Sequence, residues 1–68
     1  MKHFYKDPLG GVTFVGNNES EALETMQQDY GFDLEEVFDL AIDGQIIEAK
    51  SRSDAEAHFS AKKRKGEA

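Results

Sequence analysis

Carboxylate side chains are the most numerous chemically active groups in this sequence, and most of them lie in its middle. Eleven of the 14 acidic residues fall between Asp7 and Ala49, a stretch that contains no Lys or Arg. Surface charges of both signs are usually interspersed, whereas a segregated field steers a partner of opposite charge. The stretch therefore predicts an acidic face that docks on a basic protein surface, with ordinary solubilising acidity as the alternative. The candidate partner-binding residues are Glu21, Glu24, Glu35, Glu36, Asp39 and Asp43.

Carboxylates also act in general acid–base catalysis and in cation binding, but their spacing here favours neither. Acid–base catalysis needs a pocket that separates the pKa values of two carboxyl groups, and these acids fall mostly at positions expected to be exposed. A calcium loop needs oxygen ligands at alternate positions around a glycine, and residues 39–44 contain too many apolar side chains. His3 and His58 would need a third metal ligand that the sequence does not indicate. We therefore expect no enzyme activity, no catalytic residue, no metal site and no cofactor.

Basic residues flank the acidic stretch, and four of them, Lys62, Lys63, Arg64 and Lys65, are clustered near the C-terminal end. Four charges at a chain end give weak, salt-sensitive nucleic-acid affinity, and the net charge of −6 opposes approach to DNA or RNA. Direct nucleic-acid binding is therefore disfavoured, and the expected partner is a protein with a basic surface. No apolar stretch approaches the ~18 residues of a membrane span, and no signal peptide opens the sequence. We expect no membrane association and a cytoplasmic location.

Turn and capping signals predict the elements that position these acids. A hairpin is expected over residues 3–15, because aromatic and β-branched residues flank a run of turn-forming residues. Asn18 begins a capping-box pattern, which predicts a helix over residues 19–30 with Gly31 placed to end it. A last helix is expected to begin with Ser53 as its N-cap.

Chain length sets the domain organisation. A chain of 68 residues buries only about 60% of its unfolded surface and has no Cys to form disulfides. We expect residues 1–61 to form a single compact α+β domain and residues 62–68 to form a basic, frayed tail.

Residues 32–49 fit two structures. A period of 3.6 residues gives a helix with an apolar stripe of Leu34, Val37, Phe38, Ala41 and Ile42. A period of two gives a strand that leads into Asp43-Gly44, a strong hairpin signal. An internal similarity between the two halves of the sequence, in which Gly11 aligns with Gly44, favours strand character for this stretch. The hairpin is the favoured interpretation, although only a helix would place Glu35, Glu36, Asp39 and Asp43 together along one polar side.

The favoured fold is α+β, a small antiparallel sheet of two β-hairpins with two helices on one face, in the order ββαββα. The alternative order is ββααβα, with a helical middle. The expected core comprises Phe4, Val12, Phe14, Ala22, Leu23, Met26, Tyr30, Phe38, Leu40, Ile42, Ile47 and Phe59.

Glu21-Ala22-Leu23-Glu24, with Tyr30 and Gly31-Phe32, resembles a segment of the small phage inhibitors of bacterial RNA polymerase. The rest of the chain departs from that family, so no site residue is carried over. The resemblance implies a non-enzymatic phage-type inhibitor that occupies a basic surface of a host nucleic-acid-handling protein, in the host cytoplasm. The alternative function is a small self-associating structural or assembly protein, paired through a sheet edge. The chain is expected to be a monomer or a weak homodimer.

Overall fold

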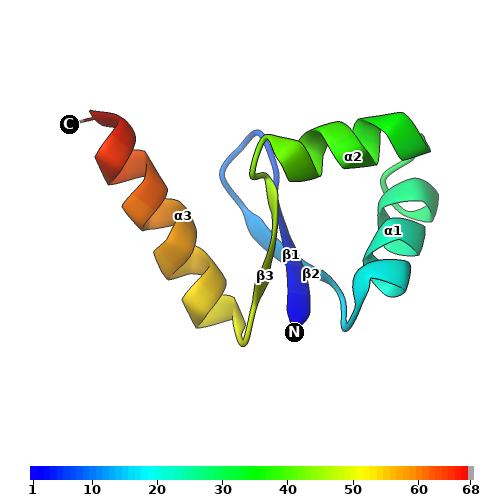
Figure 1. The fold of residues 1–68 in the computed structure, drawn as a ribbon, viewed down its shortest axis with the longest axis horizontal. Helices are drawn as coiled ribbons and strands as arrows, with labels where there is room; N and C mark the ends of the chain where they lie inside the picture. The colour runs from blue at the N-terminus through cyan, green and yellow to red at the C-terminus, as the bar shows by residue number, and fades with distance from the viewer. Residues whose placement is uncertain (68) are drawn as a thin grey trace.

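The structure is a computed structural model that describes the backbone of residues 1–67 and the side chains of residues 1–60. Its elements, in chain order, are β1 (Lys2–Lys6), β2 (Val12–Gly16), α1 (Glu19–Gln28), α2 (Leu34–Ile42), β3 (Ile46–Ala49) and α3 (Arg52–Glu67) (Figure 1). The α+β class is confirmed. The observed order is the alternative one, ββααβα, and the favoured order ββαββα is wrong.

The first strand of the chain is the central strand of the sheet. The strand order is β2-β1-β3, and both pairs are antiparallel. Phe4 lies opposite Phe14 of β2 and opposite Ile47 of β3. The predicted hairpin between β1 and β2 is confirmed, and the Asp7 carboxylate holds its turn by accepting a hydrogen bond of 3.0 Å from the N–H of Gly11.

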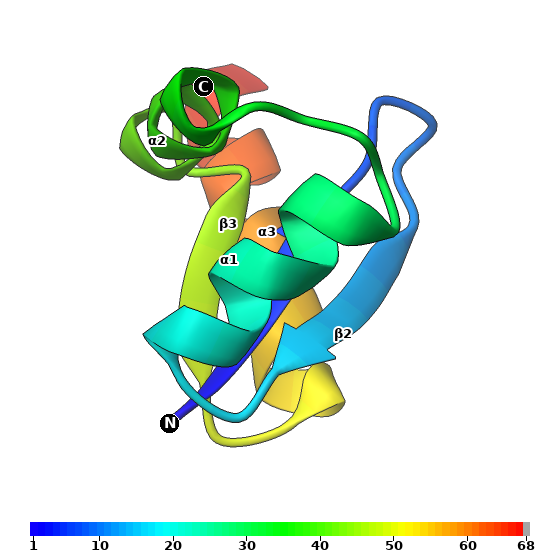
Figure 2. The ribbon, with the colours of Figure 1, turned by 90° about the vertical axis from the view of Figure 1, so that its right-hand side faces the viewer.

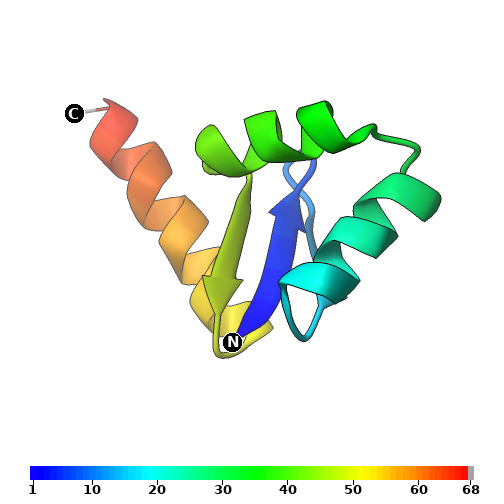
Figure 3. The same cartoon turned by 45° about the vertical axis from the view of Figure 1, so that its right-hand side comes forward.

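Helices cover both faces of the sheet (Figures 2 and 3). Consecutive strand residues point to opposite faces, and the adjacent aromatic residues Phe4 and Tyr5 are both buried. Under α3, Phe4 packs with Val12, Ala49, Ala55 and Phe59. Under α1 and α2, Tyr5 packs with Val15, Ala22, Met26 and Val37. α1 and α3, the two helices that were predicted to share one face, therefore lie on opposite faces, because a β1 strand that buries both of its sides needs a helical layer on each.

The middle of the chain forms the helix α2, so the prediction of a hairpin that begins near Phe38 is wrong. A complete capping box begins α2. The N–H of Glu36 donates to the Asp33 carboxylate at 2.8 Å, and the N–H of Asp33 donates to the Glu36 carboxylate at 3.1 Å. This reciprocal pair satisfies two N–H groups that otherwise have no partner in the first helical turn.

The Asp-Gly pair after α2 ends a helix and does not form a hairpin turn. Gly44 has a φ of +80°, and its N–H donates to the carbonyl of Ala41 at 3.1 Å. The N–H of Gln45 donates to the carbonyl of Leu40 at 2.9 Å. These two bonds form a Schellman motif. Left-handed glycine serves both a helix end and a hairpin turn, which is why the dipeptide misled the sequence interpretation.

The two strand-to-helix junctions are built alike, on opposite faces. β2 leads into α1 and β3 leads into α3, and the buried alanines Ala22 and Ala55 let each helix approach the sheet closely. At the first junction a Cβ on Gly16 would lie 2.5 Å from the backbone nitrogen of Ala22. α3 begins two residues earlier than expected, since its N-terminal hydroxyl acceptor is Ser51, at 3.2 Å from the N–H of Asp54, and not Ser53.

Four predicted core residues are exposed, namely Phe14, Tyr30, Phe38 and Ile42. Their places in the core are taken by Tyr5, Val15, Val37, Ala49 and Ala55. Because α3 is a single helix through Glu67, secondary structure marks no boundary at residue 62. The side chains of residues 61–68 lie outside the described residues, so the division into a domain and a tail stays a prediction.

Candidate docking face

Helix α2 carries more apolar surface than the domain covers. At 100° per residue, its apolar side chains spread over a wide arc. One end of the arc, with Val37 and the half-buried Leu40, packs against the core. The other end is a row of side chains at positions i, i+4 and i+8. This apolar row consists of Leu34, Phe38 and Ile42, which are 45%, 49% and 82% exposed.

Acidic residues border the apolar row. The same helical geometry places Glu35 and Asp39 next to the row and Glu36 and Asp43 farther round the helix. The helix thus gathers all four on one side, as the helical interpretation requires. Glu36 also holds the capping box, and Asp43 is the C-cap residue. Glu35 and Asp39 have no hydrogen bond or ion pair with any described side chain, so their charges are available to a partner.

The two remaining candidates, Glu21 and Glu24, lie on α1 and are exposed. Glu21 has a local structural role, because its carboxylate accepts hydrogen bonds from the N–H of Asn17 at 2.9 Å and from the Asn17 side-chain amide at 3.3 Å. Glu24 is exposed. The assignment of these residues to a partner-binding face stays a prediction.

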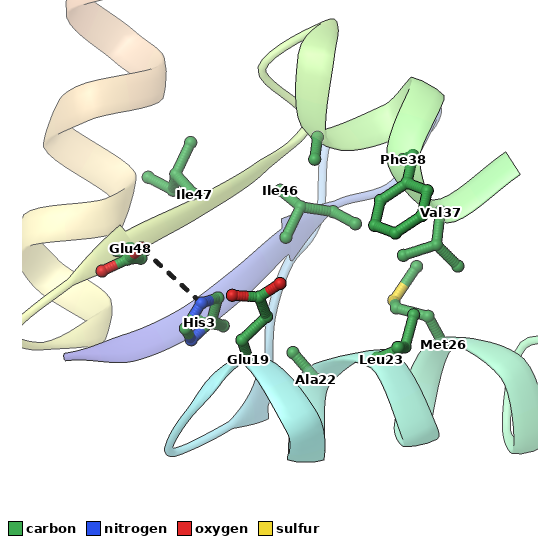
Figure 4. Close-up of a pocket in the computed structure, with 11 residues that line it drawn as sticks. His3, Glu19, Ala22, Leu23, Met26, Val37, Phe38, Ile46, Ile47 and Glu48 are labelled. Carbon is green, nitrogen blue, oxygen red and sulfur yellow. Dashed lines mark ion pairs between the residues drawn. The ribbon is translucent and has the colours of Figure 1, made fainter. Parts of the chain in front are cut away.

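An open groove of about 230 Å³ lies beside α2, on the face of the sheet that carries α1. α1 lies over β1 and β2, while β3 lies to one side of it and α2 runs across the end of the strands (Figure 2). The part of the sheet beside α1, over β3, is therefore not covered by a helix on this face. Most of the groove's lining is apolar and includes Ala22, Leu23, Met26, Val37, Phe38 and Ile46 (Figure 4).

The end of the groove away from α2 is polar. His3, Glu19 and Glu48 converge there from β1, α1 and β3 (Figure 4). The His3 Nε2 atom is 3.8 Å from the Glu48 carboxylate, and the buried Nδ1 atom has no hydrogen-bond partner in the described part of the chain. Sequence reasoning missed Glu19 and Glu48 as candidate residues. The only available signal was the alternation of β3, which sets Glu48 on the same face as Ile46.

An aromatic cluster fixes the start of α2. The Tyr5 ring makes edge contacts with the rings of Tyr30 and Phe32, at centroid distances of 5.2 and 6.1 Å. Since Tyr30 and Phe32 flank the left-handed Gly31, the connection between α1 and α2 is anchored on the central strand. Burial raises the pKa of Tyr5, and the nearby Asp7 carboxylate and Tyr30 raise it further.

The central strand also separates the charges. Lys2, Phe4 and Lys6 alternate with His3 and Tyr5, so the two lysines lie on the face of the sheet that carries α3. Lys6 confirms this placement, because its Nζ atom lies 5.5 Å from the centre of the Phe59 ring. No Lys or Arg lines the groove on the opposite face. The carboxylates that line the groove are therefore those of Glu19 and Glu48, while the two lysines of β1 lie on the other face.

Neither a metal-binding cluster nor a membrane-spanning helix is found among the described residues. No group of three or more His, Cys, Asp and Glu side chains among them is arranged to hold a metal ion. None of the helices in the described part of the chain has both the length and the apolar character needed to cross a bilayer.

Comparison with protein-family models, with curated proteins and with solved structures finds no match to this chain. The short resemblance to the phage RNA polymerase inhibitors therefore gains no support from a relative. A functional proposal has to rest on the geometry of α2 and of the groove beside it.

Proposed function

We propose that this protein is a non-enzymatic binding module that docks through α2 on a protein with a basic surface. The observation that carries the proposal is the exposed apolar row of Leu34, Phe38 and Ile42 beside the acidic residues Glu35 and Asp39. Interfaces commonly combine an apolar centre with a polar rim, and a contiguous exposed apolar patch with such a rim marks an interaction site.

The charge distribution supports a basic partner. An acidic side raises the encounter rate with a cationic surface and suppresses wrong partners of like charge. Occupation of a basic surface that handles nucleic acid would inhibit its owner, so the inhibitor role expected from the sequence is retained as part of this proposal. A role in the cytoplasm is proposed with it.

A capture experiment on bacterial lysate with the immobilised protein tests the proposal. We expect a basic protein to be retained at low salt and released at high salt, because rim charges are screened as ionic strength rises. Asp39→Lys should reduce retention several-fold. Glu56→Lys is the control, since it reverses one exposed charge on α3, on the other face of the sheet, and the ion pair with Arg52 that it removes is exposed. A partner retained equally by both variants and at both salt concentrations contradicts the proposal.

A second candidate function, self-association, is favoured by the outer edge of β2. In the described part of the chain no strand pairs with this edge. The strand carries no charged residue or proline, and Phe14 is 44% exposed on it. Uncharged edge strands of this kind pair readily with another chain. Sedimentation at micromolar concentration tests this function, and a strict monomer whose behaviour Thr13→Lys leaves unchanged would exclude it.

A further inference from the structure

The groove beside α2 lies over β3, at a part of the sheet that α1 does not cover. On the opposite face α3 packs across both β2 and β3. On this face α1 packs on β2 and β1, and α2 crosses the far end of the strands, which leaves the groove over β3. Its volume of about 230 Å³ exceeds the ~150 Å³ of an engineered apolar cavity that binds benzene. It therefore has room for at least one large apolar side chain.

We infer that the groove binds a cationic amphipathic helix of a partner protein, which completes the second helical layer. This inference rests on the proposed function and names the structure that the partner presents. In helix-in-groove recognition, side chains at positions i, i+3 or i+4, and i+7 fill an apolar groove. Here the apolar end of the groove, at Val37 and Phe38, accepts the anchors, and the acidic end, at Glu19 and Glu48, faces a Lys or Arg.

Charge selects a cationic partner over a second copy of this chain. The exposed apolar helix that a second copy could present is α2, and its apolar row is bordered by Glu35 and Asp39. A symmetric pair formed in this way would bring these carboxylates toward Glu19 and Glu48, with no Lys or Arg lining the groove to compensate. Like charges placed together at an interface oppose association. A helix whose apolar face is flanked by Lys or Arg has the complementary pattern.

A synthetic peptide is the direct probe. The peptide has roughly 15 residues, the length at which an isolated helix becomes marginally stable, and is built from Ala, Lys and Leu with all leucines on one helical face. Two controls share its length. One has the same composition with the leucines scattered round the helix, and the other has Glu in place of Lys. We expect binding of the first peptide alone, with amide chemical-shift changes confined to the residues that line the groove.

Variants of the protein locate the site. Ala41→Phe places a large side chain in the groove from an exposed helical position and should weaken peptide binding at least ~10-fold. Ala57→Phe is the matched control, since it makes the same change at an exposed position of α3 and should leave binding unchanged. Glu19→Gln with Glu48→Gln should weaken binding roughly 2- to 10-fold and reduce its salt dependence. Urea denaturation of each variant shows whether the fold is retained.

Three outcomes of the peptide experiments overturn the inference: equal binding of the scattered peptide, equal binding of the acidic peptide, or unchanged binding by Ala41→Phe in a folded protein. Groove shifts that depend on protein concentration without any peptide would assign the groove to a second copy and overturn it as well. If these peptide experiments fail while a lysate partner is still lost in Asp39→Lys, the groove inference is wrong and the proposed function stands. If the peptide binds in the groove and no basic protein is captured, the proposed function is contradicted instead.

Discussion

Helices α2 and α3 lie on opposite faces of one sheet and differ in how completely the domain covers their apolar side chains. In the described part of α3, the anchors are Ala55 and Phe59, which are 0% and 6% exposed. α2 has five large apolar side chains, Leu34, Val37, Phe38, Leu40 and Ile42, yet the buried residue on it is Val37. A helix that keeps large apolar side chains in water loses the free energy that their burial would supply, about 1.5–3 kcal/mol for each one.

This difference indicates separate roles for the two faces. The α3 face serves the stability of the domain, because its central side chains Phe4, Ala55 and Phe59 are all buried within the chain. The α2 face is held by its capping box, its Schellman motif and a small contact area. Its remaining apolar side chains are exposed and available to other molecules. Four predictions test this distinction.

The largest expected effect comes from replacing one phenylalanine on each face of the sheet with alanine. Phe59→Ala removes a buried aromatic side chain and should cost about 3–5 kcal/mol of unfolding free energy. A domain of this size has only about 3–5 kcal/mol in total, so much of the variant should be unfolded. Phe38→Ala removes a half-exposed ring and should cost roughly 1 kcal/mol or less. Urea denaturation followed by circular dichroism measures both, and equal losses would refute the distinction between the faces.

A smaller effect is expected at the junction between β2 and α1. In Gly16→Ala the new Cβ would lie 2.5 Å from the Ala22 backbone nitrogen, so β2 and α1 must separate, at a cost of about 1–3 kcal/mol. The matching position before α3 is Ala49, where a Cβ is already accommodated. Thermal denaturation checks the loss. A Gly16→Ala variant as stable as the wild type would show that α1 can shift on the sheet without cost.

Loss of the α2 cap should have a still smaller effect. Asp33→Ala removes the carboxylate that accepts from the Glu36 N–H and should cost about 1 kcal/mol. Hydrogen exchange should accelerate mainly in α2, because this helix has few buried contacts to hold it once the cap is lost. Asn18→Ala, which removes the corresponding cap of α1, is the control. Acceleration spread evenly over all helices would mean that α2 does not open independently.

The smallest effect concerns alkaline pH. The pKa of Tyr5 is raised in the folded state above its ordinary value of 10.0, so the unfolded chain releases this proton first. Unfolding then becomes easier as pH rises through the unfolded pKa, and the loss is complete above the folded pKa. The urea midpoint of the wild type should be lower at a pH above the usual tyrosine pKa than at neutral pH. This difference between the two midpoints should be smaller in Tyr5→Phe. An unchanged pH dependence in that variant would show that Tyr5 does not report on this side of the core.

Local chemistry made part of this fold predictable. The β1–β2 turn, the Asn18 cap and the left-handed Gly31 were all expected, because each depends on residues close together in the chain. The α2 segment was predicted to be part of a hairpin because the Asp43-Gly44 pair at its end suits a helix end and a hairpin turn equally well. Coverage of both sheet faces could have been inferred from the adjacent Phe4 and Tyr5, but alternation of apolar and polar residues was expected instead.

The candidate site was predictable only in part, for the same reason. Once α2 is a helix, the position of Glu35 and Asp39 beside the apolar row follows from their spacing. The groove does not, since His3, Glu19, Phe38 and Glu48 come from four elements that are distant in sequence. Residue periodicity describes one element at a time, so it carries no information on which part of a sheet a helix leaves open.

The position of β1 in the sheet has a consequence for synthesis of the chain. As the central strand it is made first, and it pairs with β2 almost at once, but its other edge stays unpaired until β3 has left the ribosome. During that interval the nascent chain exposes a strand edge and the Phe4 ring, because its cover α3 follows β3 in the chain. Unpaired edges of this kind favour association between chains. We expect slow translation before Ile46 to lower the yield of folded protein.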